Sequence, residues 1–227
     1  MPQHECRMKL FGLTGGIGMG KSAAAHILSQ RGIMVEDTDE LARCIVEPSQ
    51  PALAEIQRTF GDEVVSAEGT LRRDVLARIV FSDPAARQKL ETITHPRIRE
   101  LWKKRVETWR RMGGVKAACV VIPLLFETNA ESEFDATICV ACSAATQRSR
   151  LAIRGWTTEQ TAQRIAAQFP IEKKITKANY VVWNEGGLKI LAAQLEVILG
   201  QFYIWSGSQP AHGGINPAGD APSRVAF

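Results

Sequence analysis

The sequence predicts a three-layer α/β domain built on a five-stranded parallel sheet. Short apolar runs alternate with helical segments along most of the chain, which is the pattern of parallel strands joined by crossover helices. The run at residues 115–122 is continuously apolar, as is typical of a strand buried on both faces. A glycine-rich loop follows the first such run, and a helical segment follows that loop. With 227 residues, 45% of them hydrophobic, the chain is long enough for one sizeable core and a smaller lobe.

The first strand and helix enclose the most informative stretch of the sequence. An apolar run at residues 8–13 predicts a buried strand, and residues 22–30 predict a helix. Between them lies Gly15-x4-Gly20-Lys21-Ser22, which is the pattern of a phosphate-binding loop. Glycines allow successive N–H groups to point inward, and the helix start adds its positive dipole end. We expect Lys21 to reach the β and γ phosphates of a nucleotide and the Ser22 hydroxyl to ligate Mg²⁺.

A second strand at residues 33–35 leads directly into acidic residues. Asp37 and Asp39 follow it, and the carboxyl end of a strand in an open α/β sheet is where ligands bind. If the segment is extended, the two side chains face the same way. One of them could ligate a metal or accept a hydroxyl proton. Alternatively, Asp39 caps a helix at residues 40–46, and the two roles do not exclude each other.

Residues 48–114 predict a mostly helical insertion between the second and third strands. We expect its helices to be interrupted at Pro48, Pro51, Gly61, Gly69, Pro84 and Pro96. Residues 97–111 hold seven basic residues and two acidic ones. A solvated helix face is the simpler explanation for them, and attraction of an acidic substrate is the other. His95, beside Pro96, is more typical of a structural histidine than of a functional one.

Three further strand-like runs and their helices complete the pattern. The runs cover residues 115–122, 136–141 and 180–183, and the predicted helices cover residues 143–154, a segment after the capping box 157–160, and residues 188–202. Gln147, Arg150 and Arg154 share one helix face, and so do Arg164 and Gln168. Inward arginines beside a phosphate site indicate a lid over the nucleotide. Solubility explains the same arginines equally well.

Composition restricts the class of protein and its surroundings. The net charge of +4 is compatible with an anionic small molecule and does not demand nucleic acid. No apolar run approaches the ~20 residues that span a bilayer, and we expect a cytoplasmic protein. The five cysteines include Cys139-x-x-Cys142, which no second pair completes, so buried free thiols are predicted. Residues 206–227 are rich in Gly, Pro, Ser and Ala, and this composition predicts a disordered tail.

Several strings, in this order, give the sequence a resemblance to the dephospho-coenzyme A kinase family from about Met8 to Leu199. They are Leu13-Thr14-Gly15-Gly16-Ile17-Gly18-x-Gly20-Lys21-Ser22, Asp37-Thr38-Asp39 with Ala42-Arg43, Val80-Phe81, His95-Pro96-x-Ile98, Pro123-Leu124-Leu125-Phe126-Glu127, Gln147-x-x-Arg150-x-x-x-Arg154 and Arg164-Ile165-x-x-Gln168. The sequence departs from the family pattern at four places. Met19 replaces a small residue of the loop, Arg72 lies where the family often has Asp, Asn179 lies where an Asp is common, and Trp183-Asn184 replaces the usual Asp-Asn near the adenine.

The resemblance implies a P-loop fold and ATP-dependent phosphorylation of the 3′-hydroxyl of dephospho-coenzyme A, the last step of coenzyme A synthesis. It implies that the loop residues Gly15, Gly16, Ile17, Gly18, Met19, Gly20, Lys21 and Ser22 bind ATP, with Mg²⁺ on Ser22. Asp39 would take the proton of the ribose hydroxyl, and Arg150 and Arg154 would offset the developing charge. The implied acceptor contacts are Asp37, Arg43, Arg73, His95, Leu124 and Leu125.

The sequence also predicts how the chain is divided into domains, and it leaves alternative functions open. We expect one kinase domain at residues 8–205, with its core at about 8–47 and 115–205. The insertion would cover about 48–114 and the lid about 144–170, with an N-terminal extension at 1–7. We expect a monomer without nucleic-acid or membrane partners. A nucleoside or nucleoside monophosphate kinase is the runner-up, and a non-catalytic nucleotide-binding module is another alternative. A GTPase would carry an Asn-Lys-x-Asp string, which does not occur.

Overall fold

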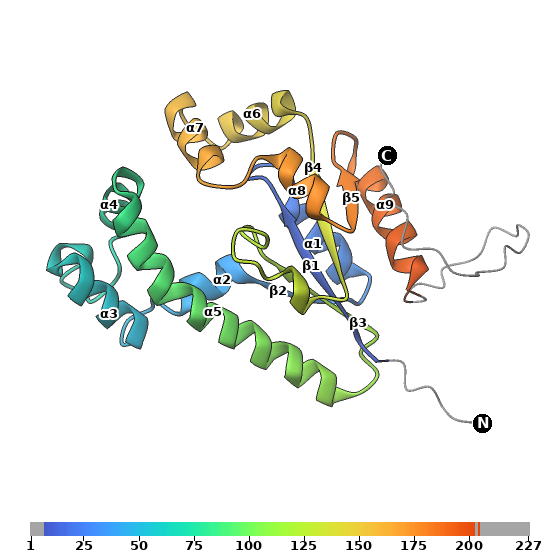
Figure 1. Ribbon diagram of the computed structural model, residues 1–227, viewed down its shortest axis with the longest axis horizontal. Helices are drawn as coiled ribbons and strands as arrows, with labels where there is room; N and C mark the ends of the chain where they lie inside the picture. The colour runs from blue at the N-terminus through green and yellow to red at the C-terminus, as the bar shows by residue number, and fades with distance from the viewer. Residues whose placement is uncertain (1–6, 203, 205–227) are drawn as a thin grey trace, which may run out of the picture. The chain divides into compact units, whose positions relative to one another are not determined.

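The computed structural model describes residues 7–202 and 204, and these residues form two compact units (Figure 1). The sheet unit comprises the described residues up to Val35 and from Met112 onward. The helical unit comprises Glu36–Arg111. Each unit has its own hydrophobic cluster, as expected of a compact folding unit. Residues 1–6 of the predicted extension at 1–7, and the predicted tail at residues 206–227, lie outside the described residues.

Five parallel strands form the sheet, in the order β2-β3-β1-β4-β5. They are β1 Lys9–Gly15, β2 Met34–Asp37, β3 Ala117–Val121, β4 Ala136–Ala141 and β5 Tyr180–Trp183. Leu13 of the central strand β1 pairs with Val121 on one side and Ile138 on the other. The continuous apolar runs are explained by this position, because helices cover both faces of the inner strands. The carboxyl ends of β1, β3 and β4 therefore meet at one edge, where the candidate site lies.

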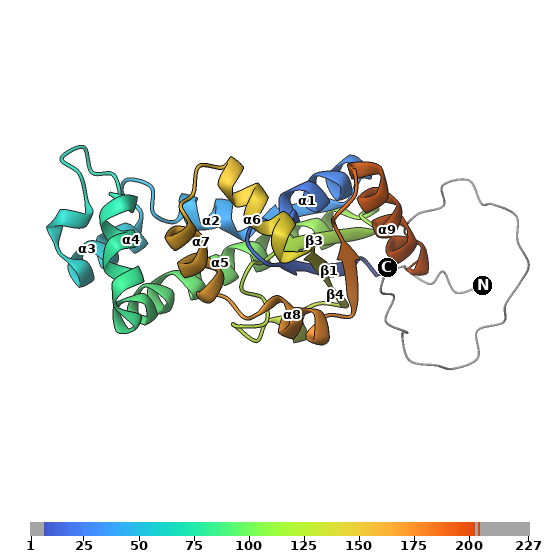
Figure 2. The same cartoon turned by 90° about the horizontal axis from the view of Figure 1, so that it is seen from above.

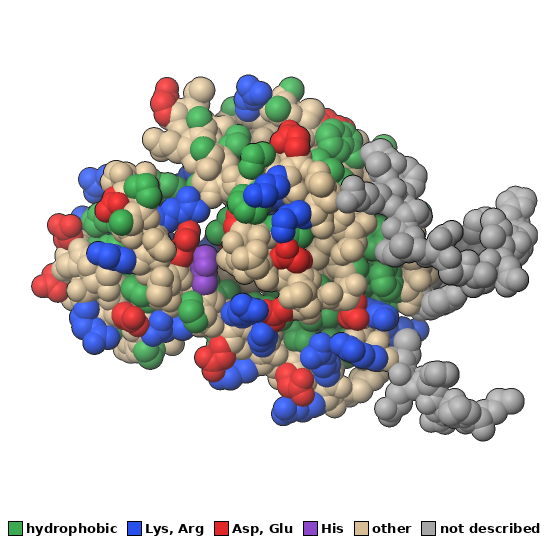
Figure 3. All heavy atoms as spheres, viewed as in Figure 1, with side chains coloured by type: hydrophobic (Ala, Val, Ile, Leu, Met, Phe, Trp, Pro, Cys, Tyr) green, Lys and Arg blue, Asp and Glu red, His purple; other side chains and the backbone are tan. Residues whose placement is uncertain are grey.

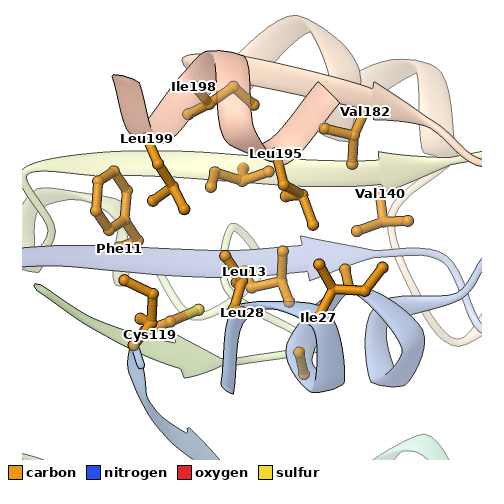
Figure 4. Close-up of a cluster of buried hydrophobic side chains, with 14 of the residues drawn as sticks. Phe11, Leu13, Ile27, Leu28, Cys119, Val140, Val182, Leu195, Ile198 and Leu199 are labelled. Atoms are coloured by element: carbon orange, nitrogen blue, oxygen red, sulfur yellow. The ribbon is translucent and has the colours of Figure 1, made fainter. Parts of the chain in front are cut away.

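Helices enclose the sheet on both faces (Figure 2). Helices α1 (Lys21–Gln30) and α9 (Leu188–Gln201) lie on one face, and α8 (Ile171–Lys177) lies on the other. The remaining helices of this unit are η2 Glu131–Glu133, α6 Ala144–Ile153 and α7 Thr158–Ala166. Side chains from β1, α1 and α9 meet in one cluster, in which Leu13, Leu28 and Leu195 are all buried (Figure 4). This burial is the main stabilising contribution to the unit.

The helical unit contains four α-helices and one short 3₁₀ turn among its described residues. They are α2 Thr38–Cys44, α3 Pro51–Phe60, η1 Asp62–Val64, α4 Arg73–Ser82, and α5 Pro84–Met112, whose last residue lies just beyond the unit. Ile56, Val64, Leu76 and Ile93 form the centre of its apolar cluster. The predicted interruptions at Pro51, Gly61 and Pro84 fall at element boundaries.

Pro96 is the predicted interruption that is wrong, because it lies inside the continuous helix α5. A proline within a helix removes one backbone hydrogen bond and disturbs the carbonyls of the preceding turn. Here the Arg97 guanidinium donates to the carbonyl of Ile93 at 2.5 Å, so a side chain satisfies part of that turn. Helix α5 can therefore continue from Pro84 to Met112 in spite of its internal proline.

Two further expectations need correction in the described residues. The second strand is shifted from residues 33–35 to Met34–Asp37, and the helix after it begins at Thr38 rather than Glu40. Cys44 is exposed, whereas Cys119, Cys139 and Cys142 are buried free thiols as predicted. Burial raises the pKa of Cys139 to about 12, so this thiol stays protonated at neutral pH. No helix within the described ranges is long and apolar enough to cross a membrane.

Candidate active site

The loop between β1 and α1 has the backbone that a phosphate-binding loop requires. Gly15, Gly18 and Gly20 have φ values of 146°, 76° and 104°, which disfavour any residue with a side chain. A Cβ at Gly15 would lie 2.2 Å from the Val140 carbonyl oxygen, and one at Gly20 would lie 1.9 Å from Asn184 Nδ2. The loop is thus confined by its neighbours as well as by its own conformation. The N–H groups at the start of α1 and the positive end of its dipole add an anion-binding position.

Lys21 and Ser22 occupy the first two positions of α1. The Lys21 ammonium group donates to the carbonyls of Gly15 and Gly16 at 3.0 and 3.1 Å, which keeps its charge over the loop. Ser22 is exposed, so its hydroxyl is open to a ligand. Mg²⁺ in kinases usually keeps several waters and binds few protein oxygens besides the phosphates. The Ser22 hydroxyl fits this requirement, and the described residues contain no group of three His, Cys, Asp or Glu able to hold a metal.

Side chains from α6 and from the segment after β5 contact the loop from outside. The Met19 carbonyl accepts from Asn184 Nδ2 at 2.9 Å and from Arg150 Nη1 at 3.5 Å. Gln147 Nε2 donates to the Ile17 carbonyl at 2.7 Å. Met19 itself is only 2% exposed, so its side chain contributes to the packing beneath the loop. These contacts fix the orientation of two peptide groups in the loop.

The predicted lid face divides into two parts. Gln147 and Arg150 reach the loop, and Arg150 Nη2 also donates to the Asn184 carbonyl at 2.9 Å. Arg154 lies at the C-cap of α6 and is exposed. Arg164 stacks over the Trp156 ring with 4.3 Å between the guanidinium carbon and the ring centroid. Of the two arginines in the predicted catalytic role, therefore, Arg150 already contacts the loop and Arg154 does not.

Glu185 contributes to the support of the site, and it was not identified from the sequence. Its carboxylate accepts from the Ser143 N–H and, at 2.6 Å, from the Thr146 hydroxyl, at the first turn of α6. These hydrogen bonds, led by the one from Thr146, lower the pKa of Glu185. The turn at residues 184–185 thus contacts both the phosphate loop and the start of α6. The only sequence signal was the position of this turn directly after the fifth strand.

The segment after β3 contains a second set of contacts. The Pro123 carbonyl accepts from Thr14 Oγ1 at 3.2 Å and from Lys174 Nζ at 2.6 Å. Leu125 is fully buried and packs toward Gly12, where an added Cβ would lie 2.6 Å from its Cδ1. Leu124 is partly exposed. Of the two leucines in the predicted acceptor pocket, only Leu124 therefore presents surface to a ligand.

Asp37 and Asp39 lie in the helical unit, and their positions relative to helix α2 differ from the expectation. Asp37 is the N-cap of α2, and its Oδ1 accepts from the Asp39 N–H at 2.9 Å. The prediction that Asp39 is the cap is therefore wrong, because the helix begins at Thr38 and places Asp39 in its first turn. The two side chains do not share an extended segment. The Asp39 side chain is exposed, so an acceptor can reach its carboxylate.

The other predicted acceptor contacts also lie in the helical unit. Arg43, in the last turn of α2, and Arg73, at the first position of α4, are both exposed. His95 lies inside α5 and is partly buried. Burial lowers the pKa of His95, while Glu91 opposes that shift and Arg87 adds to it. A neutral imidazole is thereby favoured at neutral pH.

The basic residues of α5 are largely paired. Acidic partners lie within ion-pair distance of Arg97, Lys104, Arg105, Arg110 and Arg111. Basic and acidic side chains are interspersed along the lower edge of the space-filling view, where α5 runs (Figure 3). Mixed charge of this kind favours a solvated helix face over a dedicated anion-binding surface.

A parallel sheet whose central strand leads through a glycine-confined loop into a helix, with Lys21 over that loop, defines a nucleotide-binding protein of the P-loop class. Gln147 and Arg150 of α6 contact this loop through the Ile17 and Met19 carbonyls. The family model of Dephospho-CoA kinase matches residues 9–189. The chain belongs to the dephospho-CoA kinase family.

Individual relatives agree with this assignment. The chain is 44% identical to the Dephospho-CoA kinase of Anaeromyxobacter dehalogenans over 194 residues, covering 85% of this chain and 91% of the relative. A crystal structure of a Thermus thermophilus protein matches with a TM-score of 0.74 and 34% identity, covering 86% of this chain and 97% of that one. The Dephospho-CoA kinase of Campylobacter jejuni, at 22% identity over 86% of this chain and 97% of that one, has a TM-score of 0.58 and shows the shared fold.

Proposed function

We propose that the chain transfers the γ-phosphoryl group of ATP to the 3′-hydroxyl of the ribose of dephospho-coenzyme A. The hydroxyl oxygen attacks the γ-phosphorus, the bond to the bridging oxygen breaks, and ADP leaves. The observation that carries the proposal is the loop between β1 and α1, with Lys21 held over Gly15 and Gly16 in a chain of this family. Phosphoryl transfer depends chiefly on positioning and charge neutralisation, which such a loop supplies.

The ATP side of the reaction is assigned to the sheet unit. The loop N–H groups and Lys21 bind the β and γ phosphates, and the Ser22 hydroxyl holds Mg²⁺, which neutralises charge as it develops on the phosphate oxygens. Arg150 stabilises the same region through its contact with the Met19 carbonyl. Arg154 is exposed, and we assign it to the transferring phosphoryl group once the lid has closed.

The acceptor side is assigned to exposed groups of the helical unit and to Leu124. Asp39 accepts the hydroxyl proton, because it is exposed and its carboxylate does not serve as the helix cap. Asp37 orients Asp39 through the hydrogen bond to its backbone. Arg43 and Arg73 bind the anionic groups of the acceptor, and His95 binds as a neutral imidazole.

The remaining assignments follow the boundaries predicted from the sequence. Residues 48–114 would bind the acceptor and residues 144–170 would form the lid. A monomeric state and a cytoplasmic location are predictions of the same proposal. A kinase for nucleosides or their monophosphates would share the loop and the lid, so the acceptor has to be identified directly.

The decisive experiment is a coupled assay of ADP release with dephospho-coenzyme A and with nucleoside monophosphates as competing acceptors. We expect Mg²⁺-dependent ADP release with dephospho-coenzyme A as the acceptor and none with the nucleoside monophosphates. The Lys21→Ala variant keeps the loop glycines and the fold but removes the ammonium group, so its kcat should fall by at least about 10²-fold. Turnover that is faster with a monophosphate would identify the alternative kinase. Wild-type turnover by Lys21→Ala would contradict the phosphate role of this residue.

A further inference from the structure

A buried ion pair lies beneath the candidate site, in the sheet unit. Lys174 Nζ lies 2.9 Å from Glu127 Oε1, and the side chains of the two residues are 0% and 15% exposed. Glu127 lies in the segment between β3 and η2, and Lys174 belongs to α8 on the sheet face opposite α1 (Figure 2). Removing two charges from water is costly, and an apolar pair of similar size is often at least as stable. Stability alone is therefore a poor explanation for the pair.

The hydrogen bonds of the pair join several segments around the site. Lys174 donates to the Pro123 carbonyl at 2.6 Å, and Thr14 of β1 donates to the same oxygen at 3.2 Å. Glu127 Oε1 also accepts from the Phe169 N–H at 2.7 Å, just beyond α7. One cluster thus connects the strand before the phosphate loop, the segment that carries Leu124, and the chain that leaves the lid.

The second oxygen of the carboxylate adds to the cost of the arrangement. Glu127 Oε2 is buried and has no hydrogen-bond partner among the described residues. A buried acceptor without a partner is destabilising. The Glu127–Lys174 pair is costly for stability but joins three segments of the site. This combination favours a role in positioning those segments.

We propose that Glu127 and Lys174 are positioning residues of the phosphoryl transfer, which hold the segment after β3 and the exit of the lid in one arrangement. The inference rests on the proposed function. Removing the pair would leave both segments folded but free to shift relative to the loop. A misplacement of about 1 Å can cost about 10²-fold in rate.

The test compares single and double variants by kcat, KM and melting temperature. Glu127→Gln and Lys174→Met each leave one buried charge unpaired, and each should lower the melting temperature by about 10 °C. The double variant contains neither charge. The amide oxygen introduced by Glu127→Gln can still accept from the Phe169 N–H, and the Thr14 hydroxyl still donates to the Pro123 carbonyl. We expect its melting temperature to return to within a few degrees of wild type. Its kcat should stay about 10- to 100-fold low, with little change in KM for ATP.

A matched control uses the neighbouring pair of Lys177 and Glu131. Their 2.7 Å ion pair joins α8 to the same region after β3, and Glu131 Oε2 also lacks a hydrogen-bond partner among the described residues. Both side chains, however, are about one-third exposed. An exposed pair contributes little, so the Lys177→Met, Glu131→Gln double variant should keep its kcat and melting temperature.

The outcomes separate the inference from the proposed function. Wild-type protein without dephospho-coenzyme A turnover would reject the proposed function itself. If the wild type is active and the Glu127–Lys174 double variant recovers both stability and kcat, the pair is merely structural and the inference is overturned. Should the double variant fail to fold, Glu127→Asp decides, since it keeps the charge and shortens the reach by one methylene. A low kcat with a stable fold supports positioning, and a wild-type kcat overturns it.

Discussion

Asp37 and Asp39 have the same side chain two positions apart, and the backbone around them separates their roles. Asp37 is at the end of β2 and caps α2, so its carboxylate is committed to a backbone N–H. Asp39 is in the first turn of the same helix and is exposed. A carboxylate there is stabilised by the helix dipole and is accessible to an acceptor hydroxyl.

Replacing Asp39 by Asn should lower kcat by about 10²–10⁴-fold, the usual contribution of a general base. The free energy of unfolding should fall by no more than about 1 kcal/mol, because Asn keeps the size of the side chain and the loss of a negative charge in the first turn of a helix costs about that much. Steady-state kinetics and urea denaturation measure the two effects. Asp37→Asn is the matched control, since Asn caps about as well as Asp, and it should lose less activity. An Mg²⁺ titration of Asp39→Asn excludes loss of a metal contact, and a wild-type kcat would place the base elsewhere.

His95 should make stability depend on pH. Burial lowers its pKa from the ordinary 6.5, so the unfolded chain takes up a proton before the folded protein does. The free energy of unfolding should thus be constant above about pH 6.5 and should decrease as the pH falls below it. Urea denaturation between about pH 7.5 and 5.5 should show this decrease. The His95→Gln variant should show a smaller slope, and identical slopes would contradict the assignment.

Local sequence signals predict some helix ends of this chain correctly and others wrongly. The capping box at Thr157 and Gln160 is present as predicted, with both reciprocal hydrogen bonds formed. Helix α1 ends shortly before Gly32, whose φ is 77°. Pro96 is different, because α5 continues through it and the Arg97 guanidinium donates to the Ile93 carbonyl of the preceding turn.

The capping box of α7 predicts a measurable effect on stability. Thr157→Ala removes the side chain that accepts from the Gln160 N–H, and should cost about 0.5–2 kcal/mol. Thr157→Ser keeps the hydroxyl and should cost much less. Thermal or urea denaturation of the two variants distinguishes them. Equal stability of both would show that α7 unfolds before the transition that is measured.

At the scale of the whole molecule, the chain divides into two compact units with separate apolar clusters. The phosphate loop belongs to the sheet unit, and most predicted acceptor contacts belong to the helical unit. Under the proposed function, damage to one cluster should therefore affect one substrate more than the other.

Ile56 is fully buried in the cluster of the helical unit, so Ile56→Ala should cost about 2–5 kcal/mol in free energy of unfolding. We expect KM for dephospho-coenzyme A to rise while the affinity for ATP is unchanged, because the loop belongs to the other unit. Kinetics and ATP-binding calorimetry measure these effects. Ile190→Ala is the control, since this side chain is 57% exposed and its loss should be nearly neutral. Equal weakening of both substrates would contradict separate roles.

The sequence by itself determined the fold class, the phosphate loop and the strands at residues 136–141 and 180–183, which the structure confirms residue for residue. These features depend on local signals, because continuous apolar runs, glycine spacing and capping patterns act over a few residues. The family motifs added the kinase assignment, which the family model bears out.

Tertiary structure alone decided the contacts that support the site. Asn184 reaches the Met19 carbonyl across 165 positions of sequence, and Lys174 meets Glu127 only because α8 packs against the sheet. The role of Asp37 as the cap depended on where β2 ends, which propensity places only to within a few residues. Such pairings depend on which distant segments a folded sheet brings together, and no local pattern encodes them.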